Sequence, residues 1–193
     1  QVDQFNPESD AGFASANEVP GVAKIGSFLY VCLSDSSGNT TEVWRYAAND
    51  TASGATQMTE TLGTTVEVTR MTSDGTNLFF NNTGGDTSTT LHIFEEFSIS
   101  GTTLTSVGTT TCGSTSNDLR NVTMDNSGNF YARPVASGTI KRFNSSGTLQ
   151  ATSDASMGSS TYTNYTIAGV PYMYRAAADS TATDAYIKIP LQP

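Results

Sequence analysis

A short pattern of apolar residues recurs four times along this chain of 193 residues, and it limits the fold more than any other feature of the sequence. The four apolar runs are Phe28-Leu29-Tyr30-Val31, Leu78-Phe79-Phe80, Phe130-Tyr131-Ala132 and Tyr172-Met173-Tyr174. Counted from Leu29 through Leu78 and Phe130 to Tyr172, the copies stand 49, 52 and 42 residues apart. A period of about 40 to 50 residues indicates that one supersecondary unit is repeated.

Further strand-like segments accompany each apolar run. A shorter segment precedes each run, at 22–25, 68–71, 122–124 and 165–167. A segment that reads apolar, variable, variable, apolar follows each run, at 43–46, 94–97, 140–143 and 186–189. Turn residues at 73–77, 125–129 and 168–171 predict tight hairpins between the first two strands. A fourth, polar strand is expected at 104–107 and at 149–151, while the first copy is expected to have a longer loop ending near Met58 in its place.

The composition agrees with repeated strands rather than helices. Only 14% of the residues are charged, against about 25% in an average domain. Ser, Thr, Gly and Asn supply the polarity instead, and strong helix formers are scarce. The sequence therefore predicts a single all-β domain over 1–193, built from four propeller-like blades of antiparallel strands, with a β-sandwich as the fallback. The repeats are expected at 22–62, 66–112, 119–158 and 161–193.

Two copies resemble known propeller blades. The third, from Asn121 through the 125–129 turn to the strand at 140–143, resembles the blades of NHL and related propellers. The Val43-Trp44-Arg45-Tyr46 segment of the first copy is similar to a strand of hemopexin-type blades, and that family closes its ring with four blades. Both resemblances imply a ring of blades.

The last repeat stops after its third strand, so one edge of its sheet needs a partner. Residues 1–6, and within them Val2, Asp3, Gln4 and Phe5, are expected to supply the missing strand. The strand would complete either the last blade of its own chain or that of a neighbouring subunit, because an uncovered edge invites pairing.

The sequence offers no recognisable catalytic set. His92 is the single histidine, which excludes a multi-histidine metal site. Glu95 and Glu96 are adjacent on a strand and point to opposite faces, so they cannot act together. No catalytic, cofactor-binding or metal-ligating residue is predicted, and the protein is expected not to be an enzyme.

Calcium is the only cofactor that the sequence leaves open. The segments 35–39 and 125–129 both carry oxygen-bearing side chains at alternate positions, with a glycine between them. Neither has the distal glutamate of a full calcium loop, so ordinary Asx turns are the favoured interpretation.

Sequons and cysteines indicate an extracellular or cell-surface protein. The chain opens without an initiator methionine, which suggests a processed, secreted chain. Sequons on predicted turns begin at Asn39, Asn49, Asn81 and Asn144, and two more begin first strands, at Asn121 and Asn164. Cys32 and Cys112 either form one disulfide or remain buried thiols.

The chain's charge narrows the range of partners. The formal net charge is −9 and there is no basic run, which disfavours nucleic acid and anionic membranes. The longest apolar stretch, 19–33, is interrupted by Pro20, Gly21, Lys24 and Gly26 and is too short to span a membrane.

Aromatic residues could form a sugar-binding platform or pack between blades: Tyr30, Trp44, Tyr46, Tyr131, Tyr172 and Tyr174. Four basic residues are expected to face solvent or a partner: Arg45, Lys141, Arg142 and Lys188.

Three functions remain open. The favoured one is a non-enzymatic structural or adhesive glycoprotein that self-associates, for example as a subunit of an extracellular filament or coat. The second is a glycan-binding propeller module. The third is a propeller hydrolase or lactonase, which needs an acid/base or metal set.

Overall fold

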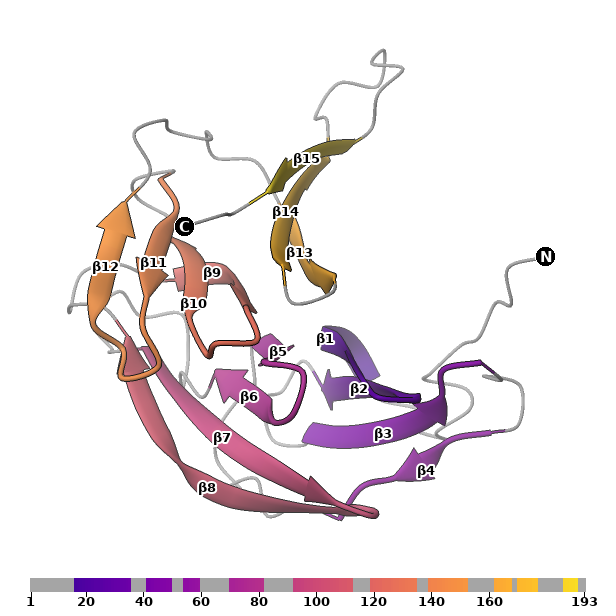
Figure 1. Ribbon diagram of the computed structural model, residues 1–193. Coiled ribbons are helices and arrows are strands. Elements are labelled where there is room, and N and C mark those ends of the chain that lie inside the picture. The colour runs from indigo at the N-terminus through magenta and orange to yellow at the C-terminus, as the bar shows by residue number, and fades with distance from the viewer. Residues whose placement is uncertain are drawn as a thin grey trace. The chain divides into compact units, whose positions relative to one another are not determined.

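The computed structural model describes residues 16–35, 41–49, 54–59, 70–81, 92–112, 119–134, 139–152, 162–167, 170–176 and 186–190, and Figure 1 shows their strands. Every regular element in these ranges is a β-strand. The prediction of an all-β chain is confirmed.

The first two sheets have four strands each. One consists of β1 (Ala16–Ile25), β2 (Phe28–Asp35), β3 (Thr41–Ala47) and β4 (Thr56–Gln57). The next consists of β5 (Arg70–Ser73), β6 (Leu78–Asn81), β7 (His92–Ser100) and β8 (Thr103–Cys112).

The last two sheets follow in the same way. The third consists of β9 (Leu119–Met124), β10 (Phe130–Pro134), β11 (Lys141–Phe143) and β12 (Leu149–Thr152). The fourth contains, among the described residues, three strands: β13 (Tyr162–Ile167), β14 (Val170–Ala176) and β15 (Tyr186–Pro190).

Within each sheet the strands lie side by side in the order of the sequence, and the registered pairs are antiparallel. This is the up-and-down order of a propeller blade. The predicted propeller-like blades are therefore present. The 1–6 segment lies outside the described residues, so strand donation by Val2 to Phe5 stays a prediction.

The chain divides into two compact units. The first consists of Gln1–Asp86 and Ile93–Thr109, and the second of Thr87–His92 and Thr110–Pro193. The first unit therefore contains the first sheet and most of the second, and the second unit contains the last two sheets.

The core of the first unit joins its two sheets. Tyr30 and Cys32 of β2 pack in one cluster with Leu78 and Phe80 of β6 and with Phe97 of β7. The rings of Phe80 and Phe97 meet edge to face, with centroids 5.4 Å apart, a geometry that aromatic pairs prefer.

Gly21 marks the closest approach of these two sheets. A Cβ atom on Gly21 of β1 would overlap the backbone carbonyl of Met71 in β5 and lie 2.9 Å from its Cβ. Only glycine allows the two inner strands to come this close.

The spacing of apolar residues in the third strands has a direct structural cause. Val43 and Tyr46 of β3 are fully buried, and so are Phe94 and Phe97 of β7. Residues three apart on a strand point to opposite faces, so each of these strands buries a side chain on both faces of its sheet. A strand that alternated in and out would leave one face in water.

The outer strands are polar, as predicted for β8 and β12, and the first sheet has the short strand β4 where the sequence predicted a longer loop. Every residue of β4 and β12 is exposed, and β8 buries only Leu104 and Cys112 near its two ends. The apolar runs of the second strands are the buried ones, with Leu78 at 0% and Phe130 at 1% exposure. Leu29 differs, because it is only half-buried while Tyr30 and Val31 next to it are buried.

Candidate functional site

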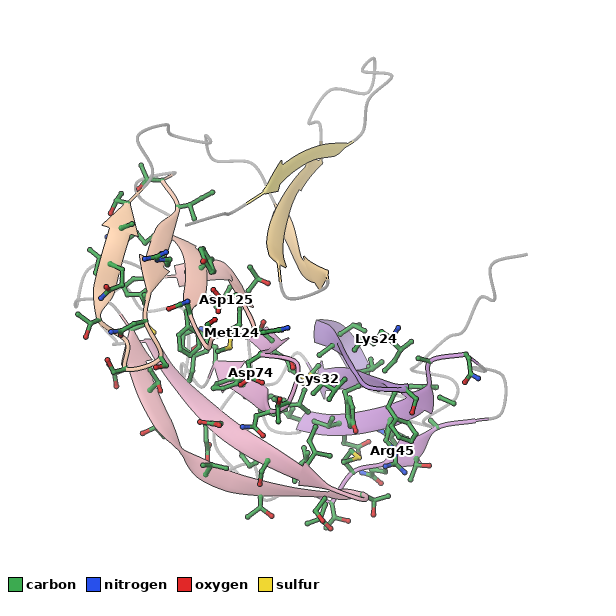
Figure 2. The ribbon with its side chains drawn as sticks, viewed as in Figure 1. Lys24, Cys32, Arg45, Asp74, Met124 and Asp125 are labelled. Carbon is green, nitrogen blue, oxygen red and sulfur yellow. The ribbon has the colours of Figure 1, made fainter. Side chains whose placement is uncertain are left out.

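Polar side chains of the third sheet converge on Asp125, at the turn between β9 and β10. One carboxylate oxygen, Oδ1, accepts hydrogen bonds from the backbone N–H groups of Ser127 and Asn129, both at 2.9 Å. Gly128 takes the positive φ of 77° that closes the turn. The turn is thus an Asx turn in which aspartate replaces a backbone acceptor, and Asp125 directly follows Met124 (Figure 2).

The other carboxylate oxygen of Asp125 points to side chains. Oδ2 accepts hydrogen bonds from Asn129 Nδ2 at 2.8 Å and from the Tyr131 hydroxyl at 3.1 Å. Four donors therefore surround one carboxylate, which fixes its orientation. The cluster of Asp125, Asn129, Tyr131 and Arg142 is called the Asp125 cluster below.

Tyr131 is held in its protonated form. Its ring is 3% exposed, and burial raises the pKa of its hydroxyl. The charge of Asp125 and the hydrogen bond to it raise this pKa further, while the Arg142 guanidinium opposes the shift. At neutral pH Tyr131 is consequently a hydrogen-bond donor and not a base.

Arg142 completes the cluster from the neighbouring strand. It is directly opposite Tyr131 in the β10–β11 register. Its Nε is buried and, among the residues that the structure describes, has no hydrogen-bond partner. One donor of the guanidinium is therefore unsatisfied within the described structure.

The second sheet has a related turn with different chemistry. Asp74 Oδ1 accepts the backbone N–H groups of Thr76 and Asn77 at 2.8 Å. Asn77 then donates to Glu96 Oε1 at 2.5 Å. Phe79 pairs with Glu96 where the third sheet pairs Tyr131 with Arg142. This turn thus lacks both a hydroxyl and a guanidinium.

The first and fourth sheets also place a basic residue opposite an aromatic one. The register pairs are Tyr30 with Arg45 and Tyr174 with Lys188. Arg45 lies over the Phe28 ring at 4.4 Å and donates from Nη1 to the carbonyl oxygen of Gly101 at 2.7 Å. Arg45, which was expected to face solvent or a partner, is half-buried and binds the β7–β8 turn of its own chain.

Most of the predicted aromatic platform is packed. Tyr30, Tyr46 and Tyr131 are at most 3% exposed. Trp44 is half-buried, and its Nε1 donates to Glu42 Oε2 at 2.8 Å. Packing within and between sheets, the alternative that the sequence left open, accounts for these four residues.

The two adjacent carboxylates of β7, which were expected to point to opposite faces, have separate partners. Glu95 accepts a hydrogen bond from the Ser106 hydroxyl of β8 at 2.7 Å, whereas Glu96 accepts from Asn77. The two carboxylates therefore serve different neighbours. His92 begins β7.

No group of three or more His, Cys, Asp or Glu residues that could hold a metal lies within the described ranges. At 125–129 both oxygens of Asp125 are occupied by protein donors. At 35–39 only Asp35, the end of β2, is described. Calcium binding stays untested.

The structure corrects one of the six sequon predictions. Asn81 is the last residue of β6 and is 1% exposed, so it is inside the sheet and not on an accessible turn. Asn49 is exposed, and Asn144 is half-buried with its Oδ1 accepting the N–H of Thr148 at 2.8 Å. Asn121 and Asn164 are in β9 and β13, and Asn39 is outside the described residues.

The cysteines lie in different sheets. Cys32 in β2 and Cys112 at the end of β8 are both buried thiols. Burial raises the pKa of the Cys112 thiol to about 12.

Sequence reasoning named Tyr131, Arg142 and the 125–129 turn separately and missed that they form one cluster. The signal was available in the hairpin register. The β10–β11 register places the second residue of the apolar run opposite the third residue of the apolar-x-x-apolar segment. That rule pairs Tyr131 with Arg142.

Comparison with known proteins gives the fold but no family. No protein-family model and no curated protein sequence matches the chain. Among solved structures it is similar to glutaminyl cyclase from Myxococcus xanthus, with a TM-score of 0.55 and 13% identity. That alignment covers 91% of this chain and 66% of the cyclase chain, so the chain spans slightly less than two thirds of the cyclase.

A second solved structure is more distant. The calcium-binding protein regucalcin from Agrobacterium tumefaciens aligns with a TM-score of 0.45 and 12% identity, over 82% of this chain and 52% of the other. The similar structures are β-propeller proteins. The propeller resemblance drawn from the sequence is supported, while its NHL-like and hemopexin-like details are not tested.

One functional prediction is overturned. The absence of catalytic motifs predicted that the protein is not an enzyme. The structure with the TM-score of 0.55 is an enzyme, glutaminyl cyclase, so that prediction is contradicted. The motifs sought in the sequence belong to other folds, and their absence does not exclude catalysis by a propeller.

The described residues contain no helix with the length and apolar character needed to span a bilayer.

Proposed function

We propose that this chain is a β-propeller domain with enzymatic activity of the hydrolase type, and that the Asp125 cluster receives the polar group of its substrate. The observation that carries the proposal is the buried Nε of Arg142, a charged donor without a partner in the described structure. A buried unsatisfied donor costs roughly 1 to 3 kcal/mol, and more when it is charged. An acceptor oxygen on a substrate would remove that cost.

The other members of the cluster suit a carbonyl or carboxylate substrate. The raised pKa of Tyr131 keeps its hydroxyl protonated beside Arg142 at neutral pH. Asp125 accepts the single O–H of that hydroxyl and so fixes the side chain next to Arg142. The Arg142 guanidinium is therefore the donor that would stabilise negative charge on an oxygen, as forms when water attacks an ester, lactone or amide carbonyl.

The fold supports this reading without identifying a substrate. Glutaminyl cyclase, an enzyme, has a similar fold over 91% of this chain. Of the three functions considered from the sequence, the propeller hydrolase is therefore favoured. Sugar binding loses support because Tyr30, Tyr46 and Tyr131 are packed. Filament formation, adhesion, secretion and glycosylation stay predictions.

The test is an activity screen of the purified chain against an aryl ester, a lactone and a peptide with an amino-terminal glutamine. For the substrate that turns over, Arg142→Met and Tyr131→Phe are expected to lower kcat/KM at least about tenfold, the effect of losing roughly 1.4 kcal/mol of transition-state stabilisation. Lys141→Met, one residue before Arg142 on β11, is the matched control and is expected to keep full activity.

Two results would overturn the proposal. One is a folded protein that turns over none of the three substrates. The other is an active protein in which Arg142→Met and Tyr131→Phe behave like Lys141→Met.

A further inference from the structure

The outer strand β8 differs from the outer strands of the other sheets. Natural proteins protect exposed sheet edges with short strands, bulges, prolines or charges. β4 has two residues, and β12 has four residues and pairs through an irregular register. β15 contains Lys188 and ends at Pro190. β8 has ten residues and contains neither a proline nor a charged residue.

The centre of β8 is exposed and apolar at one point. Residues 105–109 are all exposed, and Val107 is 59% exposed, the most exposed of the large apolar residues described. Figure 1 shows β7 and β8 as a long hairpin.

Hydrogen bonds at the start of β8 show which backbone groups face outward. The N–H of Leu104 donates to the Thr59 carbonyl at 2.9 Å, and the Thr59 N–H donates to the Thr102 carbonyl at 2.8 Å. Thr59 follows β4, so residues 102 and 104 turn their backbone groups away from β7. The direction alternates along a strand, and Ser106 and Gly108 therefore also face outward.

These two residues form the open part of the edge. Thr59 covers the beginning of β8, and the Thr110 hydroxyl donates to the Ser145 carbonyl at 3.2 Å near its end. Between those contacts, nothing in the described part of the chain pairs with the outward groups of Ser106 and Gly108.

We propose that a second copy of this chain pairs its own β8 here, antiparallel and about a twofold axis at Val107. In that register Ser106 of one copy lies opposite Gly108 of the other, and each such pair exchanges two backbone hydrogen bonds. Val107 then faces Val107 of the second copy in a non-hydrogen-bonded pair, the kind in which side chains are closest.

Charge favours the second copy over other strands. The chain carries a formal net charge of −9, but β8 contains no charged residue. Self-pairing through β8 thus places no like charges directly opposite each other, whereas charged strands would. On the face opposite Val107, Ser106 of one copy lies opposite Gly108 of the other. Glycine has no side chain, so the serine side chain meets no steric obstacle there. The contact is small, so it makes a transient dimer.

Disulfide trapping tests the register directly. Cα atoms about 4.5 Å apart, as in a non-hydrogen-bonded antiparallel pair, are within disulfide range. Val107→Cys is therefore expected to form a covalent dimer under mild oxidation, measured by mass on a non-reducing gel. Leu149→Cys is the control, since Leu149 is 48% exposed on the outer strand β12. The native thiols are buried and do not compete.

A second pair of variants tests the backbone bonds. Gly108→Pro removes one outward N–H and is expected to abolish the concentration-dependent dimer in sedimentation velocity. Gly108→Ala keeps the N–H and meets no atom within 4 Å, so it is expected to retain the dimer. Equal cross-linking of Val107→Cys and Leu149→Cys would overturn the proposal, as would a dimer that persists in a folded Gly108→Pro protein. Neither result depends on catalytic activity.

Discussion

At the scale of single residues, side chains with several hydrogen-bond partners contribute more to the structure than exposed side chains do. Asp125 accepts four hydrogen bonds, and Asp74 in the equivalent turn accepts two backbone bonds. Sequence reasoning recognised both turns from their composition. It did not combine each turn with the second residue of the strand that follows, which is Tyr131 after one turn and Phe79 after the other, and so it missed that only Asp125 holds a tyrosine.

This difference predicts unequal costs of substitution. Asp125→Ala leaves two backbone N–H groups, an amide and a hydroxyl without their acceptor and is expected to lower the free energy of unfolding by about 2 to 4 kcal/mol. Asp74→Ala is the control and is expected to cost about 1 to 2 kcal/mol. Urea unfolding measures both, and equal losses would contradict the account of the cluster.

The buried thiol of Cys112 predicts a pH dependence. Its pKa is about 12 in the folded protein, against an ordinary value of 9.0. Between these values the unfolded chain loses the thiol proton and the folded chain keeps it. The free energy of unfolding therefore falls as pH rises from 9 towards 12, by up to about 1.4 kcal/mol per pH unit.

Urea unfolding at several pH values between about 8 and 11 checks this slope, with Cys112→Ala as the control. The other titrating groups are common to both proteins, so the wild-type chain is expected to lose stability more steeply than the variant. Identical slopes would show that Cys112 is not shielded from water.

At the scale of elements, the sequence predicted the strands well because two signals agreed. Turn residues placed the hairpins, and apolar spacing placed the strands between them. Asn81 shows where local signals failed. Its sequon was assigned to a turn, but β6 continues through it and buries the side chain. Whether a residue at the end of a strand is buried depends on the neighbouring strands, and the local sequence does not identify those strands.

One close contact between elements gives a prediction at this scale. Gly147 in the β11–β12 turn has a φ of 79°, and a Cβ there would overlap the Thr111 carbonyl oxygen in β8. Gly147→Ala is expected to destabilise the protein by roughly 2 to 4 kcal/mol, from backbone strain and the clash together.

Gly26 separates the two causes. Its φ is 58°, and nothing lies within 4 Å of the position that a methyl group would take there. Gly26→Ala is therefore expected to cost only the strain, about 1 to 2 kcal/mol. Thermal or urea unfolding compares the two variants, and a Gly147→Ala protein as stable as Gly26→Ala would argue against the contact with β8.

At the scale of the whole molecule, the net charge and the open edge of β8 both affect self-association. The net charge of −9 makes two copies repel, while the proposed contact through β8 is uncharged. Salt screens the repulsion without weakening uncharged backbone pairing. The sequence predicted self-association from the last sheet, but it could not compare the outer strands before their lengths and registers were known.

The resulting prediction concerns ionic strength. Raising NaCl from about 20 to about 300 mM, which shortens the screening length to well below protein dimensions, is expected to increase the dimer fraction in sedimentation velocity. A dimer that dissociates with added salt would mean that charged groups hold it, and β8 would not be the contact.

The central claim is that the chain consists of consecutive antiparallel sheets with blade topology, and amide hydrogen exchange of the native protein tests it most directly. The amides of the central strands β6, β7, β10 and β11 are expected to exchange slowest, because these strands have neighbours on both sides. The outward amides of Ser106 and Gly108 are expected to exchange fast in the dilute monomer. Rapid exchange throughout the central strands, or equal protection along all of β8, would contradict the account.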